Sequence, residues 1–161
     1  MNGLARAAAL VLVAAARLAG AQQILVPMDD AQQNHLKAYG VTFAALKAGE
    51  KGEWLLNYRG GSFLLADTPA TRRRAALDGV SLEPVDAATT SAIRGEMAAG
   101  NMDAVVLEKA PRIAIYTPPN APPWDDAVTL ALRYAGIEYD TVWDDQVMKG
   151  DLQKYDWLHL F

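Results

Sequence analysis

Cysteine is absent from this chain, and so is any surplus of positive charge. Without cysteine among its 161 residues, the protein has no disulfide framework and no thiolate nucleophile, so a packed core must supply its stability. A hydrophobic content of 52% is ordinary for a globular protein. The formal net charge is −4. Because nucleic-acid binding requires clustered lysine and arginine, we expect no nucleic-acid partner.

The few basic residues are unevenly placed. Arg6 and Arg17 lie in the first 21 residues, which contain no acidic residue, so the rest of the chain carries a formal charge of −6. The one basic run, Arg72–Arg74, falls inside a predicted helix. We interpret it as a solvated helix face.

Long hydrophobic runs are also missing, except near the N-terminus. The apolar run from Ala7 to Ala16 follows Arg6 and precedes the small residues 19–21. This is the pattern of a secretory signal peptide, and the run is too short to span a membrane. We expect residues 1–21 to be a signal peptide, cleaved near Ala21, and the protein to be periplasmic or extracellular. An amphipathic N-terminal helix is the alternative, and no later segment predicts a transmembrane helix.

Strand and helix patterns alternate after the N-terminal segment. The alternation predicts an α/β fold with three layers, a mostly parallel sheet and flanking helices. A polar break at 109–111 divides the chain into an N-terminal α/β domain, residues 22–110, and the start of a second domain, residues 111–161. The expected strands are 23–28, 53–58, 62–66, 80–85, 103–108, 112–117, 137–143 and 155–161, and the expected helices lie between them.

Four stretches of the chain are distinctive together: "ILVPMDDAQQNHLKAYGV", "WLLNYRGGSFLL", "PRIAIYTPPNAPPWDDAVTLALRYAGIEYD" and "YDWLHL". They resemble a group of bacterial exported proteins commonly labelled asparagine synthetase B. From Arg112 onward the chain resembles the start of a class I glutamine amidotransferase-like, flavodoxin-like domain. The resemblance implies a longer protein and a second sheet that is incomplete here.

The activity that this label implies does not fit the residues. A glutamine-dependent asparagine synthetase needs an N-terminal cysteine nucleophile and an ATP-binding loop of the Ser-Gly-Gly-Leu-Asp-Ser type, and the chain has neither. We therefore predict no catalytic residues, no cofactor and no metal for this chain. Three functions stay open: a noncatalytic amidotransferase-like fragment, an extracytoplasmic binding module for a small anion or a carbohydrate, and the N-terminal part of a hydrolase or transferase.

Loops at the carboxyl ends of the predicted strands supply the candidate ligand-binding residues, because open α/β sheets bind ligands there. Arg59 and the glycines beside it suggest an anion cradle, and the aspartates suggest a hard-cation site. The simpler interpretations are helix caps for the aspartates and a two-residue hairpin turn for Gly60 and Gly61. The candidates are Asp29, Asp30, Asn57, Arg59, Gly60, Gly61, Ser62, Asp125, Asp126 and His159.

His159 lies in the apolar last segment, "YDWLHLF". Strand alternation places it on one face with Trp157, and a lone histidine there is ordinarily a core or rim residue. With the strand order 2-1-3-4-5 of flavodoxin-like sheets, this segment is the third strand and forms an uncovered edge. We therefore expect the chain to be incomplete after Phe161 and to self-associate through this strand.

Overall fold

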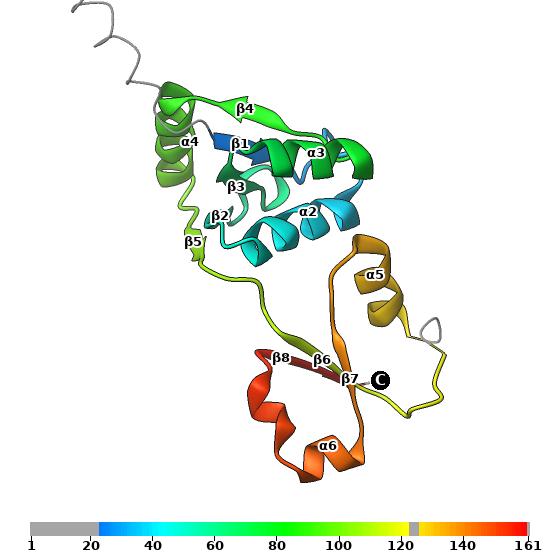
Figure 1. The fold of residues 1–161 in the computed structure, drawn as a ribbon. Helices are drawn as coiled ribbons and strands as arrows, with labels where there is room; N and C mark the ends of the chain where they lie inside the picture. Colours follow the sequence, from blue (N-terminus) through cyan, green and yellow to red (C-terminus); the bar gives the residue numbers. More distant parts are fainter. Residues whose placement is uncertain (1–22, 123–125, 161) are drawn as a thin grey trace, which may run out of the picture.

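The computed structural model describes residues 23–122 and 126–160 and places them in two sheets (Figure 1). The first sheet has five strands in the order β4-β1-β3-β2-β5, and every neighbouring pair is antiparallel. Its strands are β1 (Gln23–Val26), β2 (Gly52–Leu55), β3 (Phe63–Ala66), β4 (Glu83–Val85) and β5 (Ala104–Leu107).

The expectation of a mostly parallel sheet is therefore wrong for these five strands, although mixed α/β structure is present. Helices do connect strands of the same direction, from β1 to β2 and from β3 to β4, as crossover spacing requires. However, β3 lies between β1 and β2, and β1 lies between β3 and β4. The spacing thus predicted strand direction correctly but not which strands are neighbours.

Helices cover both faces of the first sheet. Helices α2 (His35–Lys47) and α3 (Pro69–Asp78) pack on one face, and α4 (Ala87–Ala99) packs on the other (Figure 1). Alternation along β1 separates the two cores, since Ile24 and Val26 join Ala38 and Val41 of α2, whereas Leu25 joins Ile93 of α4. This part of the molecule therefore has the three layers that the sequence predicts.

The second sheet is parallel and has the order β7-β6-β8. Its strands are β6 (Ile113–Tyr116), β7 (Asp140–Val142) and β8 (Trp157–Leu160). This is the 2-1-3 arrangement that the resemblance to flavodoxin-like sheets implies, with β8 at the edge. Helix α5 (Ala127–Ala135) connects β6 to β7, and α6 (Asp144–Met148) with the short 3₁₀ helix η3 (Asp151–Lys154) leads to β8.

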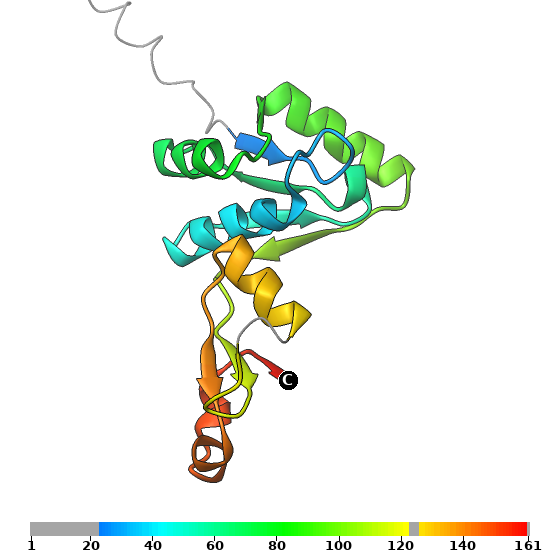
Figure 2. The same ribbon diagram turned by 90° about the vertical axis from the view of Figure 1, so that its right-hand side faces the viewer.

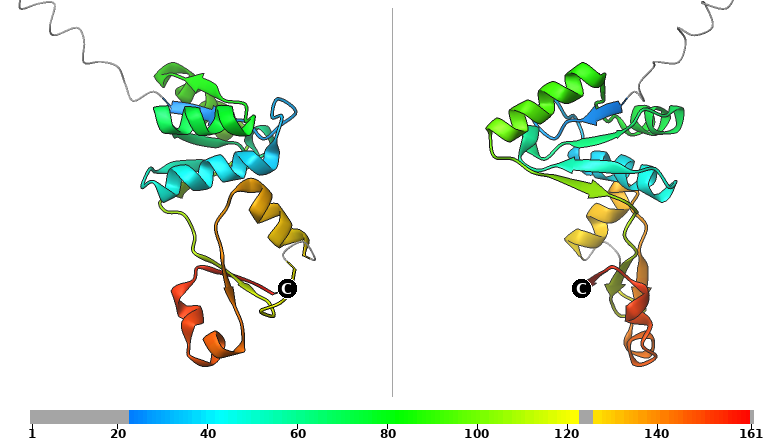
Figure 3. Two further views of the ribbon diagram at one scale, coloured as in Figure 1. Left: turned by 45° about the vertical axis from the view of Figure 1, so that its right-hand side comes forward. Right: turned by 90° about the vertical axis from the view of Figure 1, so that its left-hand side faces the viewer.

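Helix α2 also holds the second sheet. Phe43 of α2 shares a buried cluster with Ile113 and Ile115 of β6 and Leu132 of α5. Figures 2 and 3 show α5 lying directly beside α2, with the linker after β5 passing between the two sheets. Within the described residues, no helix has the length and apolar character needed to cross a membrane.

The contact between α2 and α5 depends on a glycine. A Cβ atom on Gly40 of α2 would lie 1.9 Å from the carbonyl oxygen of Ala135, at the C-terminus of α5. Polar contacts flank this close approach, because Asn34 Nδ2 donates to the Tyr134 hydroxyl at 2.7 Å and the Lys37 ammonium lies 5.1 Å from the centre of the Tyr134 ring. Any larger residue at position 40 must push the two helices apart.

We expect Gly40→Ala to lower the free energy of unfolding by about 1–3 kcal/mol, the usual effect of overpacking. The loss should exceed the gain of about 0.5–1 kcal/mol that alanine brings to a helix interior. Gly95→Ala in α4 is the matched control, since a Cβ there meets nothing within 4 Å, and it should stabilise the protein. Urea unfolding of both variants measures the difference, and equal stabilisation by both would contradict the contact.

Candidate functional site

Asp126 and His159, two of the predicted site residues, lie together at the carboxyl ends of β6 and β8. His159 Nε2 is 3.1 Å from Asp126 Oδ2, although 33 positions separate them in the sequence. The same oxygen accepts hydrogen bonds from the backbone N–H and the hydroxyl of Thr129, at 2.7 and 2.8 Å. Asp126 is therefore both the N-cap of α5, as its simpler interpretation predicts, and the partner of the histidine.

The position of this pair in the sheet is one that favours ligands. The chain leaves β6 through α5 to reach β7 on one side, and β8 lies on the other side of β6. The carboxyl ends of β6 and β8 thus lie at the point where the connections diverge, and open α/β sheets bind ligands in the crevice there. The His159 and Asp126 side chains are 21% and 19% exposed, so solvent reaches both.

Hydrogen bonds favour the ionised form of the Asp126 carboxyl. The Thr129 backbone N–H is the main cause that lowers the pKa of the Asp126 carboxyl, and His159 lowers it further. Asp126 is therefore an anion at neutral pH and an acceptor. With Nε2 facing this acceptor, the proton of a neutral His159 is assigned to Nε2, and Nδ1 accepts hydrogen bonds.

An apolar groove of about 330 Å³ adjoins the pair. Leu36 and Tyr39 of α2 form one wall, α5 forms another, and Trp157 of β8 completes it. The Trp157 ring lies 6.4 Å from the His159 ring, centre to centre. Trp157 and Tyr39 are each 43% exposed, which is high for aromatic residues in contact with an apolar surface. Tyr39 is not among the site residues predicted from the sequence, because its spacing from Leu36 and Phe43 is typical of an apolar helix stripe.

Thr117, immediately after β6, is a second residue of interest that is not among the predicted site residues. Its hydroxyl is the one buried side-chain oxygen without a hydrogen-bond partner in the described part of the chain. It borders a cavity of about 40 Å³ that Thr129 and Thr141 also line. A space of this size with hydroxyl groups around it fits a water molecule. The carboxyl end of β6 is thus polar inside as well as at its surface.

Arg59 pairs with two carboxylates. Its Nε lies 2.6 Å from Asp29 Oδ2, and its Nη1 lies 2.7 Å from Glu83 Oε2. Nη2 contacts the second oxygen of each carboxylate, at 3.3 and 2.9 Å. The Arg59 backbone is left-handed, with φ 44° and ψ 52°. These bonds use four of the five guanidinium N–H groups, and two carboxylates compensate the charge, so the cluster is an ionic clamp joining the ends of β1 and β4 to the loop after β2.

The loop between β2 and β3 is longer than predicted. The prediction of a two-residue turn at Gly60 and Gly61 is wrong, because β2 already ends at Leu55. The Leu55 N–H donates a hydrogen bond to the Ser62 carbonyl at 2.8 Å. Asn57 has a left-handed backbone conformation, so the chain turns before the two glycines, and the 3₁₀ helix η2 (Tyr58–Gly60) follows. The buried Tyr58 anchors this loop against the α4 core. Gly60 is needed where it lies, since a Cβ there would meet the Met28 carbonyl oxygen at 2.2 Å.

Ser62 and Asp29 form hydrogen bonds within their own loops. Ser62 donates its hydroxyl to the Arg59 carbonyl at 3.1 Å. The aspartates after β1 do not cap α2, because Asn34 does so through Lys37 N–H, while Asp29 accepts from Ala31 N–H. Asp30 is exposed.

Asp125 lies outside the described residues. Among the described residues, no three histidine, aspartate or glutamate side chains gather as a metal site would require. No family model, curated protein or solved structure matches the chain. The functional assignment therefore depends on geometry and residue chemistry.

The clamp gives a pH-dependent contribution to stability. Hydrogen bonds from Arg59 are the main cause that lowers the pKa of Asp29 in the folded state. The contribution is therefore present above the unfolded-state pKa, about 3.9, and is lost as the pH falls through the lower folded-state value. Asp29→Asn should lower the free energy of unfolding at pH 7 by about 0.5–1 kcal/mol, the upper range for exposed pairs.

The control for this prediction is Asp30→Asn, a change at the exposed neighbour. Urea unfolding at pH 7 and at pH 3 should show a difference between the two variants that shrinks at the lower pH. A difference that persists unchanged at pH 3 would show that Asp29 acts through its packing rather than through its charge.

Proposed function

We propose that the chain is an exported binding module that holds a small, neutral, hydroxyl-bearing ligand of the carbohydrate class at the carboxyl ends of β6 and β8. The observation that carries this proposal is the His159–Asp126 pair beside an apolar groove with two half-exposed aromatic rings. Ligand sites combine a mostly apolar wall with a few polar groups that fix orientation.

Charge favours a neutral ligand over an anion. Asp126 is anionic at neutral pH and repels a carboxylate or phosphate, while a ligand hydroxyl donates a hydrogen bond to it. Arg59, the cation on which an anion site would depend, is already bound to Asp29 and Glu83. The C–H face of a sugar ring suits the exposed rings of Trp157 and Tyr39, and its hydroxyl groups suit Asp126 and Nδ1 of His159.

A noncatalytic role is consistent with the composition of the site. A histidine oriented by a carboxylate is part of a catalytic triad, but the chain has no cysteine to serve as a thiolate nucleophile. The histidine–carboxylate pair is also the observation that favours a second candidate, the N-terminal part of a hydrolase or transferase. The 2-1-3 order of the second sheet supports, in both cases, the proposed likeness to an amidotransferase-like domain.

Binding to the pair is tested with His159→Gln, and His35→Gln, at the other histidine of the chain, is the control. NMR titration with a panel of mono- and disaccharides should show affinity that His159→Gln weakens by about two- to tenfold, the effect of one hydrogen bond. Asp126→Asn should weaken binding similarly while still capping α5, because asparagine is a good N-cap. Preferential binding of inorganic phosphate would contradict the proposal.

Export is the second part of the proposal, and it is supported by the N-terminal sequence pattern. Expression of the full chain in a bacterium should give a periplasmic or secreted form that begins at Gln22. Mass spectrometry of the N-terminus measures this directly. An intact Met1 found only in the cytosolic fraction would contradict export without affecting the binding site.

Self-association through β8 is also part of the proposal. Trp157, Leu158 and Leu160 are 43%, 37% and 66% exposed, and the strand carries no acidic residue, lysine or proline. The edge strands β4 and β7 differ from β8, because they contain Pro84 and Asp140, which disfavour pairing with a strand of another molecule. An unguarded, apolar edge offers backbone groups to a strand of a second molecule.

A further inference from the structure

Strand β5 is the outer strand of the first sheet, yet its sequence is typical of an interior strand. Its residues, "AVVL", include no charged residue, glycine or proline. Because successive side chains point to opposite faces, the strand is apolar on both faces, as strands covered on both sides are. Within the described part of the chain it pairs only with β2, and Val105 and Val106 are 43% and 61% exposed. The strand therefore lacks the neighbour that its sequence fits.

The pairing with β2 shows which backbone groups of β5 face outward. The Leu56 N–H donates to the Asp103 carbonyl at 2.8 Å, in continuation of the register between β2 and β5. Hydrogen-bonded and non-hydrogen-bonded pairs alternate along an antiparallel ladder. The odd-numbered residues of β5 therefore direct their N–H and C=O groups toward β2, and the even-numbered residues, Ala104 and Val106, direct theirs toward the open edge.

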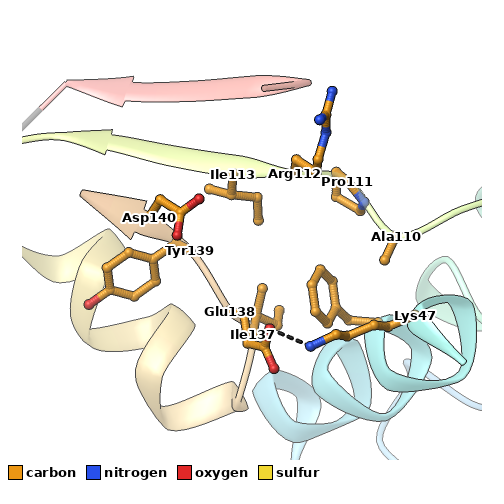
Figure 4. A pocket seen from close by; sticks show the side chains of 10 residues that line it. Lys47, Ala110, Pro111, Arg112, Ile113, Ile137, Glu138, Tyr139 and Asp140 are labelled. Carbon is orange, nitrogen blue, oxygen red and sulfur yellow. Dashed lines mark hydrogen bonds and ion pairs between the residues drawn. The ribbon is translucent and has the colours of Figure 1, made fainter. Parts of the chain in front are cut away.

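The linker after β5 leaves this edge uncovered. Ala110, Pro111 and Arg112 line a cavity of about 460 Å³ at the amino ends of β6 and β7, together with Phe43 and Lys47 of α2. Figure 4 shows Pro111 on one side of this cavity and Lys47 on the other. The chain thus turns toward α2 and the second sheet, and β5 stays at the margin of the first sheet (Figure 1).

We propose that β5 pairs antiparallel with β5 of a second copy of this chain, so that the two first sheets become one continuous sheet. Val106 lies at the two-fold axis opposite its own copy, and these two residues exchange both backbone hydrogen bonds. The proposal stands independently of the carbohydrate site and of the β8 edge, because it shares no residue with either.

Charge complementarity selects this register. With Val106 opposite Val106, Asp103 of each copy lies opposite Lys109 of the other, and facing residues of opposite charge stabilise a strand pair. The alternation of backbone groups also allows a shift by two residues in either direction. Those two registers place Asp103 opposite Leu107 or Pro111 instead. Asp103 is exposed and forms no ion pair among the described residues.

Lys109 can change partner at little cost. Its ammonium pairs with Asp156 at 2.6 Å, but its side chain is 68% exposed, and such exposed pairs contribute little. Asp156 also accepts a hydrogen bond from the Arg112 backbone N–H at 2.8 Å. The carboxylate therefore keeps a partner when Lys109 turns to the second copy.

The same register buries apolar side chains on both faces of the sheet. On one face, Val105 lies opposite Leu107 of the second copy and beside Trp54, its neighbour on β2, which is 38% exposed. On the other face, the two Val106 side chains meet. The pairing thus covers the exposed valines that the single chain leaves in water.

Single cysteines test the register, because the chain contains no other thiol. The two Val106 Cα atoms should lie about 5.5 Å apart, within the range of a disulfide. The two Ala104 Cα atoms should lie more than about 13 Å apart, since Ala104 faces position 108. Oxidation with copper phenanthroline should therefore give a covalent dimer of Val106→Cys and little of Ala104→Cys. Equal cross-linking of both variants, or none of Val106→Cys, would overturn the proposal.

Charge variants of the full chain test the same interface without a cross-link. In sedimentation equilibrium, Asp103→Lys and Lys109→Asp should each raise the dimer dissociation constant by about two- to tenfold, because each places like charges opposite one another. The double swap should restore association. Leu160→Lys, in β8, is the control and should leave the cross-linking of Val106→Cys unchanged. A monomer at every concentration, or a double swap that associates no better than the single variants, would contradict the pairing.

Discussion

Helix α2 is buried from two sides, and the arrangement of both sheets depends on this double packing. Ala38 and Val41 pack on the first sheet, while Phe43 packs on β6 of the second. The helix therefore cannot present a single apolar stripe with a polar opposite face. Gly40 reconciles the two demands, because only a residue without Cβ lets the backbone of α5 approach at Ala135. The relative position of the sheets follows from this one close contact.

The apolar groove and the cavity at the amino ends of the strands lie along the same helix. Leu36 and Tyr39, in its first half, line the groove beside the His159–Asp126 pair, and Phe43 and Lys47, in its second half, line the cavity at the amino ends of the strands. Gly40 lies between them. The groove and the cavity therefore share a scaffold, and any change in the spacing of α2 and α5 alters both.

The sequence predicted this architecture where local patterns determine it. Alternating strands and helices predicted parallel strands in the second sheet, and the order of those strands came from the resemblance to flavodoxin-like sheets. The same reasoning failed for the first sheet, where β3 pairs between β1 and β2. Crossover spacing fixes the direction of a strand, but side-chain packing over long sequence distances decides which strand lies next to it. The turn at Gly60 failed for a similar reason, since the buried Tyr58 holds a longer loop.

The candidate site was predicted residue by residue but not in its combination. The sequence predicts Asp126 just before a helix and His159 on a strand. Their contact could not be predicted, because it depends on the pairing of β8 with β6. Arg59 illustrates the opposite outcome. A cation beside two glycines suggested an anion site, but Glu83, 24 positions later, joins Asp29 in binding it. Because long-range ion pairing compensates charges that the sequence alone leaves unpaired, the arrangement of groups in the fold is better evidence for a ligand site than a charged motif.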